Sequence, residues 1–185
     1  NNHSLLAWSF DSKGSEFYEI KVKDLNNKKQ LKDNIKNTDG RIVWSLNNEG
    51  FYYIKMDKNH RPSSLYFHLL GTHQDKDTEI YNEKDSGYFL NISETLSKKY
   101  LVLNIHNHET SEVRIINQEE KNKKLELIAK RKKGIEYSIE HDRENSRLLI
   151  LTNKDDAIDF KLMETNENEL SKKNWIDFLP HREGT

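Results

Sequence analysis

Four apolar segments of one pattern recur along this chain at almost constant spacing. They read EFYEIKV from Glu16, SLYFHLL from Ser64, SEVRIIN from Ser111 and DFKLMET from Asp159, so their starts are separated by 48, 47 and 48 residues. A repeat of this length, built from strand-forming residues, is typical of a β-propeller, in which each blade is a four-stranded antiparallel sheet. The repeat therefore predicts the fold before any single element is considered.

Each repeat contains further strand-forming runs, and Asn, Asp, Gly or Ser clusters that favour turns separate most of them. The run before the repeated segment reads LLAWSFD, FYYIKMD, YLVLNIH and LLILTN in the four repeats. The run after it reads KQLKDNI, TEIYNEK, LELIAKR and NWIDFLP. Three of the repeats also begin with a further run, RIVWSL, YFLNIS or IEYSIE. The run LELIA lies among Lys and Glu residues, but its apolar positions do not continue at helical spacing, so we expect a strand. The prediction is an all-β chain: one partial β-propeller domain with approximate blades at residues 1–40, 41–87, 88–134 and 135–185.

The first repeat is incomplete, because only the four residues NNHS stand before its second strand. So short a segment does not supply the strand that would close a four-bladed ring. We therefore expect a section of a larger ring, whose open edges carry unpaired backbone groups and favour self-association.

Composition excludes several classes of protein. The formal net charge is −1, so no overall field attracts nucleic acid or an anionic membrane. The chain has no cysteine, which leaves neither a disulfide framework nor a thiolate metal site and is compatible with the reducing cytoplasm, where we expect the protein. The apolar runs have the length of strands rather than of membrane spans, and the first residues do not form a signal peptide.

Motifs for catalysis and cofactor binding are missing from the sequence. It contains no Gly-x-Ser-x-Gly elbow, no Ser-x-x-Lys, no glycine-rich phosphate loop and no His-Glu-x-x-His. We therefore assign no catalytic residue, no cofactor and no metal ligand to this chain.

His106 and His108 are spaced so that both side chains fit one face of a strand, as a metal site requires. They stand where a strand enters the turn NHETS, with Glu109 and Glu112 as the nearest carboxylates. A metal ion would need a third donor in a fixed position. An exposed hairpin tip is the favoured interpretation.

Two further groups of polar residues have alternative interpretations. His141 and Asp142 lie at a strand end before a turn, and a catalytic dyad there would need a nucleophile that the neighbouring sequence does not supply. The basic run KRKKG, from Lys130 to Gly134, has acidic residues on both sides and no aromatic platform, so a solvated loop between blades is favoured over a nucleic-acid contact.

Aromatic side chains are concentrated in the second repeat. They alternate on neighbouring strands, which favours packing between blades over a peptide-binding shelf. The residues are Trp44, Tyr52, Tyr53, Tyr66 and Phe67.

Several longer stretches resemble a known family. DKNHRPSSLYFHLLGT, EIYNEKDSGYFLNISETLSKKYLVL, HETSEVRIIN, IEYSIEHD, LLILTN and NWIDFLPHREG are similar, in this order and spacing, to the amino-terminal propeller of the oligopeptidase B (protease II) branch of the prolyl oligopeptidase family of serine peptidases. The resemblance covers essentially the whole chain. It implies a seven-bladed propeller joined to an α/β-hydrolase domain that carries the Ser, Asp and His triad and the specificity residues, all outside these 185 residues.

The resemblance also implies a role for the propeller. In such an enzyme the propeller covers the active site, admits short peptides and keeps out folded proteins, while the hydrolase domain cleaves after Arg or Lys. The implied partners are the chain's own hydrolase domain and short basic peptides, and this chain alone is expected to be inactive. The alternatives are a free-standing propeller that binds a protein partner and the propeller of a proline-specific oligopeptidase.

Overall fold

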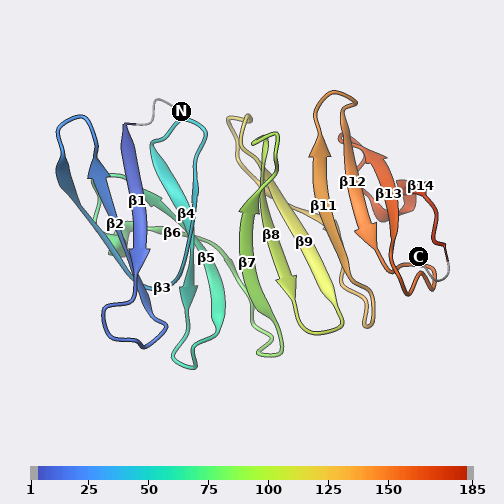
Figure 1. Cartoon of the computed structure of the whole chain (residues 1–185), viewed down its shortest axis with the longest axis horizontal. Helices are drawn as coiled ribbons and strands as arrows, with labels where there is room; N and C mark the ends of the chain where they lie inside the picture. The colour runs from blue at the N-terminus through green and yellow to red at the C-terminus, as the bar shows by residue number, and fades with distance from the viewer. Residues whose placement is uncertain (1–3, 183–185) are drawn as a thin grey trace. The chain divides into compact units, whose positions relative to one another are not determined.

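The computed structural model describes residues 4–182, and the strands of this range form antiparallel sheets. Two compact units divide the chain, Asn1–Ile92 and Ser93–Thr185. Figure 1 shows that strands and their connecting turns make up nearly all of both units. The only helices in the described range are two single turns, η1 (Gln74–Lys76) and η2 (Lys172–Asn174).

The first unit contains a six-stranded sheet in which the strands follow one another in sequence order. Its strands are β1 (Leu5–Phe10), β2 (Tyr18–Asp24), β3 (Lys29–Trp44), β4 (Gly50–Met56), β5 (Pro62–Leu69) and β6 (Thr78–Asn82). Strands β4 and β5 carry most of the buried positions of this sheet. The buried residues of β4 after Gly50 are apolar or aromatic, whereas those of β5 include Ser63, Ser64 and His68. This order is that of consecutive hairpins, as the repeat predicts.

Strand β3 differs from the sequence-based expectation. KQLKDNI and RIVWSL were predicted as two strands of different blades, whereas the structure joins them into one strand of 16 residues. The strand bends near its middle, where Asn37 and Gly40 have φ angles of 59° and 88° and the register with β4 shifts between Thr38 and Ile42. A Cβ atom on Gly40 would lie 3.0 Å from the ring of Tyr18, so glycine is needed both for its φ angle and for space.

One buried apolar cluster of the first unit joins β2, β3 and β4. Ile20, Val22 and Ile35, from β2 and β3, form a buried cluster with Phe51 and Tyr53 of β4. Around it are partly buried side chains that include Trp44 and Tyr66.

The five aromatic residues singled out by the sequence fall into two groups. Trp44, Tyr53 and Tyr66 pack in the core cluster, in agreement with the packing role predicted for them, and the Tyr53 and Tyr66 rings stack with centroids 5.7 Å apart. Tyr52 and Phe67 form a separate pair with centroids 5.0 Å apart.

Two further sheets of four strands complete the fold. One has the order β10-β9-β8-β7, built from β7 (Phe89–Glu94), β8 (Tyr100–His106), β9 (Ser111–Asn117) and β10 (Leu125–Ala129), so LELIA is a strand as predicted. The other has the order β11-β12-β13-β14, built from β11 (Tyr137–Asp142), β12 (Arg147–Thr152), β13 (Lys161–Asn166) and β14 (Ile176–Leu179).

A single apolar core joins these two sheets within the second unit. It contains buried residues from β8, β9 and β10 on one side and from β11, β12 and β13 on the other. Trp175, which precedes β14, is 6% exposed and packs edge-on against Tyr137 at 5.3 Å. The members are Tyr100, Val102, Val113, Ile115, Ile128, Ala129, Tyr137, Leu148, Ile150, Met163 and Trp175.

These sheets confirm the predicted fold class, an all-β partial β-propeller built from antiparallel hairpins in sequence order. Both helical turns in residues 4–182 are far too short to cross a membrane.

Candidate functional site

The histidines near the β8–β9 turn are separated by the local backbone. His106 is the last residue of β8, whereas His108 is an exposed residue of the turn at residues 107–110. The buried carboxylate of Glu112 lies 3.0 Å from the Arg114 guanidinium, and Glu109 lies 3.8 Å from the Lys133 ammonium. In the described part of the chain, no group of three or more His, Cys, Asp or Glu side chains is arranged to hold a metal ion.

The basic run at residues 130–134 forms the connection between β10 and β11. The Arg131 guanidinium lies 3.6 Å from Glu112, and the Arg131 backbone N–H donates to the same carboxylate at 3.2 Å. Gly134 has a φ of 78° and its N–H donates to the Thr110 hydroxyl at 3.1 Å. Hydrogen bonds and ion pairs thus tie this loop to β9 and to the turn before it, as expected for a connection between blades.

His141 has polar partners that its neighbouring sequence does not reveal. It is 4% exposed, with Nδ1 2.7 Å from the Ser97 hydroxyl and Nε2 2.8 Å from the Glu167 carboxylate. The Lys99 ammonium lies 2.7 Å from the same Glu167 oxygen, and its hydrogen bond holds the pKa of Glu167 below the ordinary value. Asp142 instead accepts a hydrogen bond from Arg147 at 2.9 Å and takes no part in this cluster.

Ser97, His141 and Glu167 are the residue types of a catalytic triad, but the turn around Ser97 lacks a place for an oxyanion. The Ser97 hydroxyl is 2.9 Å from the Thr95 hydroxyl and accepts the Lys99 N–H at 3.2 Å. The Leu96 N–H donates to Glu140, and the Lys98 N–H donates to the Thr95 carbonyl at 2.8 Å. Because these N–H groups already have acceptors inside the protein, the turn offers no donor pair for a tetrahedral intermediate.

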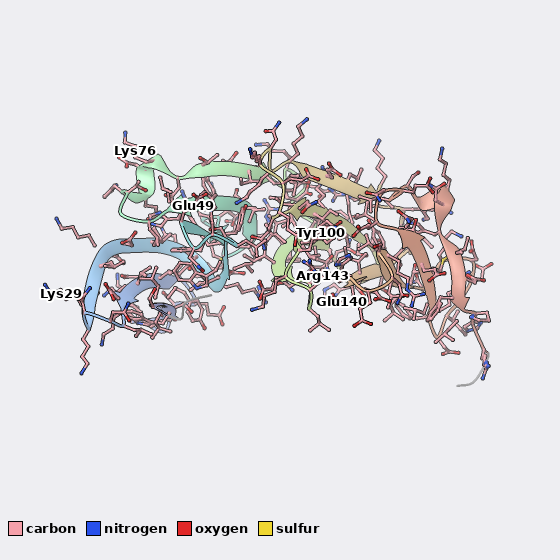
Figure 2. All side chains as sticks on the ribbon, turned by 90° about the horizontal axis from the view of Figure 1, so that it is seen from above. Lys29, Glu49, Lys76, Tyr100, Glu140 and Arg143 are labelled. Carbon is pink, nitrogen blue, oxygen red and sulfur yellow. The ribbon has the colours of Figure 1, made fainter. Side chains whose placement is uncertain are left out.

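The cluster therefore links the two sheets of the second unit by hydrogen bonds and an ion pair, and we call it the polar tie. Ser97 and Lys99 come from the β7–β8 turn, His141 from β11, and Glu167 from the turn after β13. Arg143 strengthens the tie from the surface, since it donates to the Ser97 carbonyl at 3.4 Å and pairs with Glu119 at 2.5 Å. Figure 2 labels Glu140 and Arg143 on this side of the unit.

A second buried histidine lies in the first unit, between two carboxylates. His68 of β5 is fully buried, with Nδ1 2.6 Å from Asp77 and Nε2 3.0 Å from Asp33 of β3. Tyr53 donates its hydroxyl to Asp77 at 2.9 Å, and the Gly71 N–H donates to Asp33 at 2.6 Å. This arrangement, the His68 clamp, joins β3, β5 and the segment after η1.

The His68 clamp makes the stability of the first unit depend on pH. Burial alone would lower the pKa of His68, but the hydrogen bonds to Asp77 and Asp33 outweigh it and raise that pKa above 6.5. The resulting stabilisation is complete below the unfolded pKa of about 6.5 and is lost as pH rises through the folded pKa.

We therefore expect the free energy of unfolding to fall as pH is raised above about 6.5 and through the folded pKa of His68, and the variant His68→Gln to lose this dependence. Urea unfolding of both proteins across this pH range measures the effect. An equal slope in the two proteins would show that another group is responsible.

The structure thus defines a class of protein: an all-β propeller domain in which, within the second unit, an apolar core and a polar cluster join two antiparallel sheets. The chain belongs to the prolyl oligopeptidase family, because the family model described as "Prolyl oligopeptidase, N-terminal beta-propeller domain" matches residues 1–185. It is a propeller domain of these serine peptidases, which include oligopeptidase B.

Individual relatives agree with this assignment. The chain is 34% identical to "Protease 2" of Moraxella lacunata over 98% of its own length and 26% of the relative's. It superimposes on oligopeptidase B from Leishmania major with a TM-score of 0.92 and 26% identity, covering 98% of this chain and 25% of that one. For oligopeptidase B from Trypanosoma brucei, described as a closed form with covalently bound antipain, the TM-score is 0.87 at 28% identity, with coverage of 98% and 25%. The chain therefore spans about a quarter of the length of the relatives it matches.

Proposed function

We propose that this chain is part of the propeller of a serine oligopeptidase that cleaves short peptides after Arg or Lys. The main support for this proposal is the structural similarity to oligopeptidase B from Leishmania major, which covers 98% of the chain with a TM-score of 0.92. The 34% identity to a protein named Protease 2 supports the same branch of the family. Proline specificity is the alternative, since a prolyl endopeptidase of Elizabethkingia meningoseptica is 27% identical over 95% of this chain.

The proposed role of the propeller is geometric selection. By analogy with serine peptidases, bond cleavage needs a nucleophilic Ser, a His that takes and returns the proton, and backbone N–H groups that stabilise the oxyanion. We place these groups in a hydrolase domain outside this chain. A propeller that covers them would exclude water and folded proteins while admitting short peptides.

The contacts of the second unit suit this role. A size filter must not separate along the seams between its sheets, or larger molecules would pass. Here one apolar core and the cluster of Ser97, Lys99, His141 and Glu167 hold two sheets together. Because His141 is buried and the Lys99 and Glu167 side chains are only partly exposed, the bonds of this cluster are screened less than a surface ion pair.

We expect the purified 185-residue chain to leave a chromogenic peptide with Arg before the scissile bond uncleaved. The physical reason is that the turn that carries Ser97, beside His141 and Glu167, offers no pair of N–H donors for an oxyanion. Release of the chromophore, measured with and without a serine-directed inhibitor, tests this. Inhibitor-sensitive turnover that disappears in Ser97→Ala would contradict it.

A longer protein that contains this chain and its hydrolase domain tests the specificity. We expect it to cleave the peptide with Arg or Lys before the scissile bond and to leave the matched proline peptide intact. The opposite preference would identify a proline-specific enzyme, and failure to cleave either peptide would favour a propeller that binds a protein partner.

A further inference from the structure

Strand β3 has an open edge over its first half. It pairs with β2 from Lys29 to Thr38, but its pairing with β4 covers only Thr38 to Trp44. Within residues 4–182, residues 29–37 therefore have a strand neighbour on one side only. The other side presents backbone N–H and C=O groups in the pattern that an added strand requires.

The side chain of Gln74 already shows how this edge accepts a partner. Its amide accepts the Lys36 N–H at 3.0 Å and donates to the Lys36 carbonyl at 3.0 Å, as a residue of a neighbouring strand would. The backbone groups of Lys36 thus point away from β2. Because this direction alternates along a strand, those of Asn34 point to the same side.

A polar groove follows the same edge. It has a volume of about 460 Å³ and is lined by Lys32, Asn34, Lys36, Thr72, His73 and Gln74. One wall is β3, and the other is the segment between β5 and η1. Figure 2 labels Lys29 at the start of β3 and Lys76 in η1 at this end of the unit.

The groove carries positive charge. Lys32 and Lys36 are exposed, and neither forms an ion pair with another described residue. Lys21 of β2 lies directly opposite Asn34 and adds a third cation on the same face of the sheet. Two carboxylates offset part of this charge: Asp75, which is 3.0 Å from the His73 ring and 65% exposed, and Glu19, which is on the same face of β2 as Lys21.

We propose that this groove binds an extended acidic peptide as an additional β-strand along residues 32–36, with the peptide backbone replacing the Gln74 amide at Lys36. Main-chain hydrogen bonds to the open edge would supply affinity, and carboxylates at alternate positions of the peptide would face Lys32 and Lys36. These two positions are about 13 Å apart along a strand, which corresponds to peptide residues four apart. Lysines on an edge repel a second copy of the same edge, so the site discriminates against self-pairing while it accepts acidic strands.

A nucleic acid is the less suitable occupant of this groove. Single-stranded nucleic acids bind to grooves in which bases stack on aromatic rings, and the lining contains no Phe, Tyr or Trp. The hydrogen-bonding pattern of an open strand matches a peptide backbone instead.

Fluorescence anisotropy tests the proposal with the whole chain and a labelled peptide of alternating Glu and Thr. We expect saturable binding that weakens with salt. A peptide with Lys in place of Glu should not bind. N-methylation of alternate amides leaves the charge of the Glu–Thr peptide unchanged but removes the N–H donors of those amides. The methylated peptide should therefore bind at least about tenfold more weakly. Equal binding of the methylated peptide would overturn strand addition, and tighter binding of oligo-dT than of the Glu–Thr peptide would overturn the choice of partner.

The double variant Lys32→Glu, Lys36→Glu should weaken binding by about tenfold or more, because two attractive contacts become repulsive. Its matched control is Lys121→Glu, Lys124→Glu, which reverses two exposed lysines of the second unit and should leave binding within about twofold. Circular dichroism verifies that both variants are folded. If both double variants lose the same amount of peptide affinity, the effect comes from net charge alone, and the assignment of the binding site to this groove is overturned.

Discussion

Replacement of His68 by alanine is expected to lower the free energy of unfolding by about 3–5 kcal/mol, because it leaves a buried group of like charges without its partner. Asp33 and Asp77 both hydrogen-bond to the His68 ring, and all three side chains are at most 1% exposed. One oxygen of Asp33 already has no hydrogen-bond partner, so this carboxylate has little alternative solvation. Urea unfolding near pH 6 measures the loss.

Matched variants separate the His68 clamp from a general effect of losing a histidine. His73 lies in the same unit and is 3.0 Å from Asp75, but the two side chains are 84% and 65% exposed, so His73→Ala should cost less than about 1 kcal/mol. The triple variant Asp33→Asn, His68→Gln, Asp77→Asn removes the buried charges together and should recover part of the stability lost in His68→Ala. If His68→Ala costs no more than His73→Ala, the clamp does not stabilise the unit.

The sequence predicted the strands well because strand formation follows a local pattern. Repeats of about 48 residues with turn residues between apolar runs defined β1, β2, β4 and β5 and every later strand in outline.

The continuous strand β3 was missed for a physical reason. Its bend is fixed by tertiary contacts, the Tyr18 ring against Gly40 and the Thr38 hydroxyl that donates to the Tyr18 carbonyl at 3.1 Å.

The polar clusters were largely hidden in the sequence. His68 and Asp33 are 35 residues apart, and His141 and Ser97 are 44 apart, so no local spacing brings them together. One signal was present: His68 interrupts the apolar run SLYFHLL, and a polar side chain buried in a strand requires partners. That signal predicts that partners exist, but their identity depends on how the strands pair and the sheets pack.

The Tyr137 hydroxyl fills a defect in the ladder between β9 and β10. The register of these strands shifts between Leu127 and Ala129, which interrupts their backbone bonding. The hydroxyl accepts the N–H groups of Val113 at 2.8 Å and Ala129 at 3.1 Å, and it donates to the Ala129 carbonyl at 2.6 Å. Burial raises the pKa of Tyr137 to about 12, so the hydroxyl remains a donor at all ordinary pH values.

Removal of this one oxygen in Tyr137→Phe is therefore expected to cost about 2–4 kcal/mol, because two buried N–H groups and a carbonyl lose their partner together. Trp175 packs against the ring and, as the tryptophan of the second unit, reports the transition by fluorescence during urea unfolding. Tyr66→Phe is the matched control in the first unit, where Trp44 packs against the same core cluster as Tyr66 and is a fluorescent reporter. It removes the same atom from a hydroxyl that donates to Glu79 in an exposed hydrogen bond, so it should cost less than about 1 kcal/mol. Equal costs for the two variants would mean that the strands re-form their ladder without the hydroxyl, and that the bulge, rather than Tyr137, sets the spacing of β9 and β10.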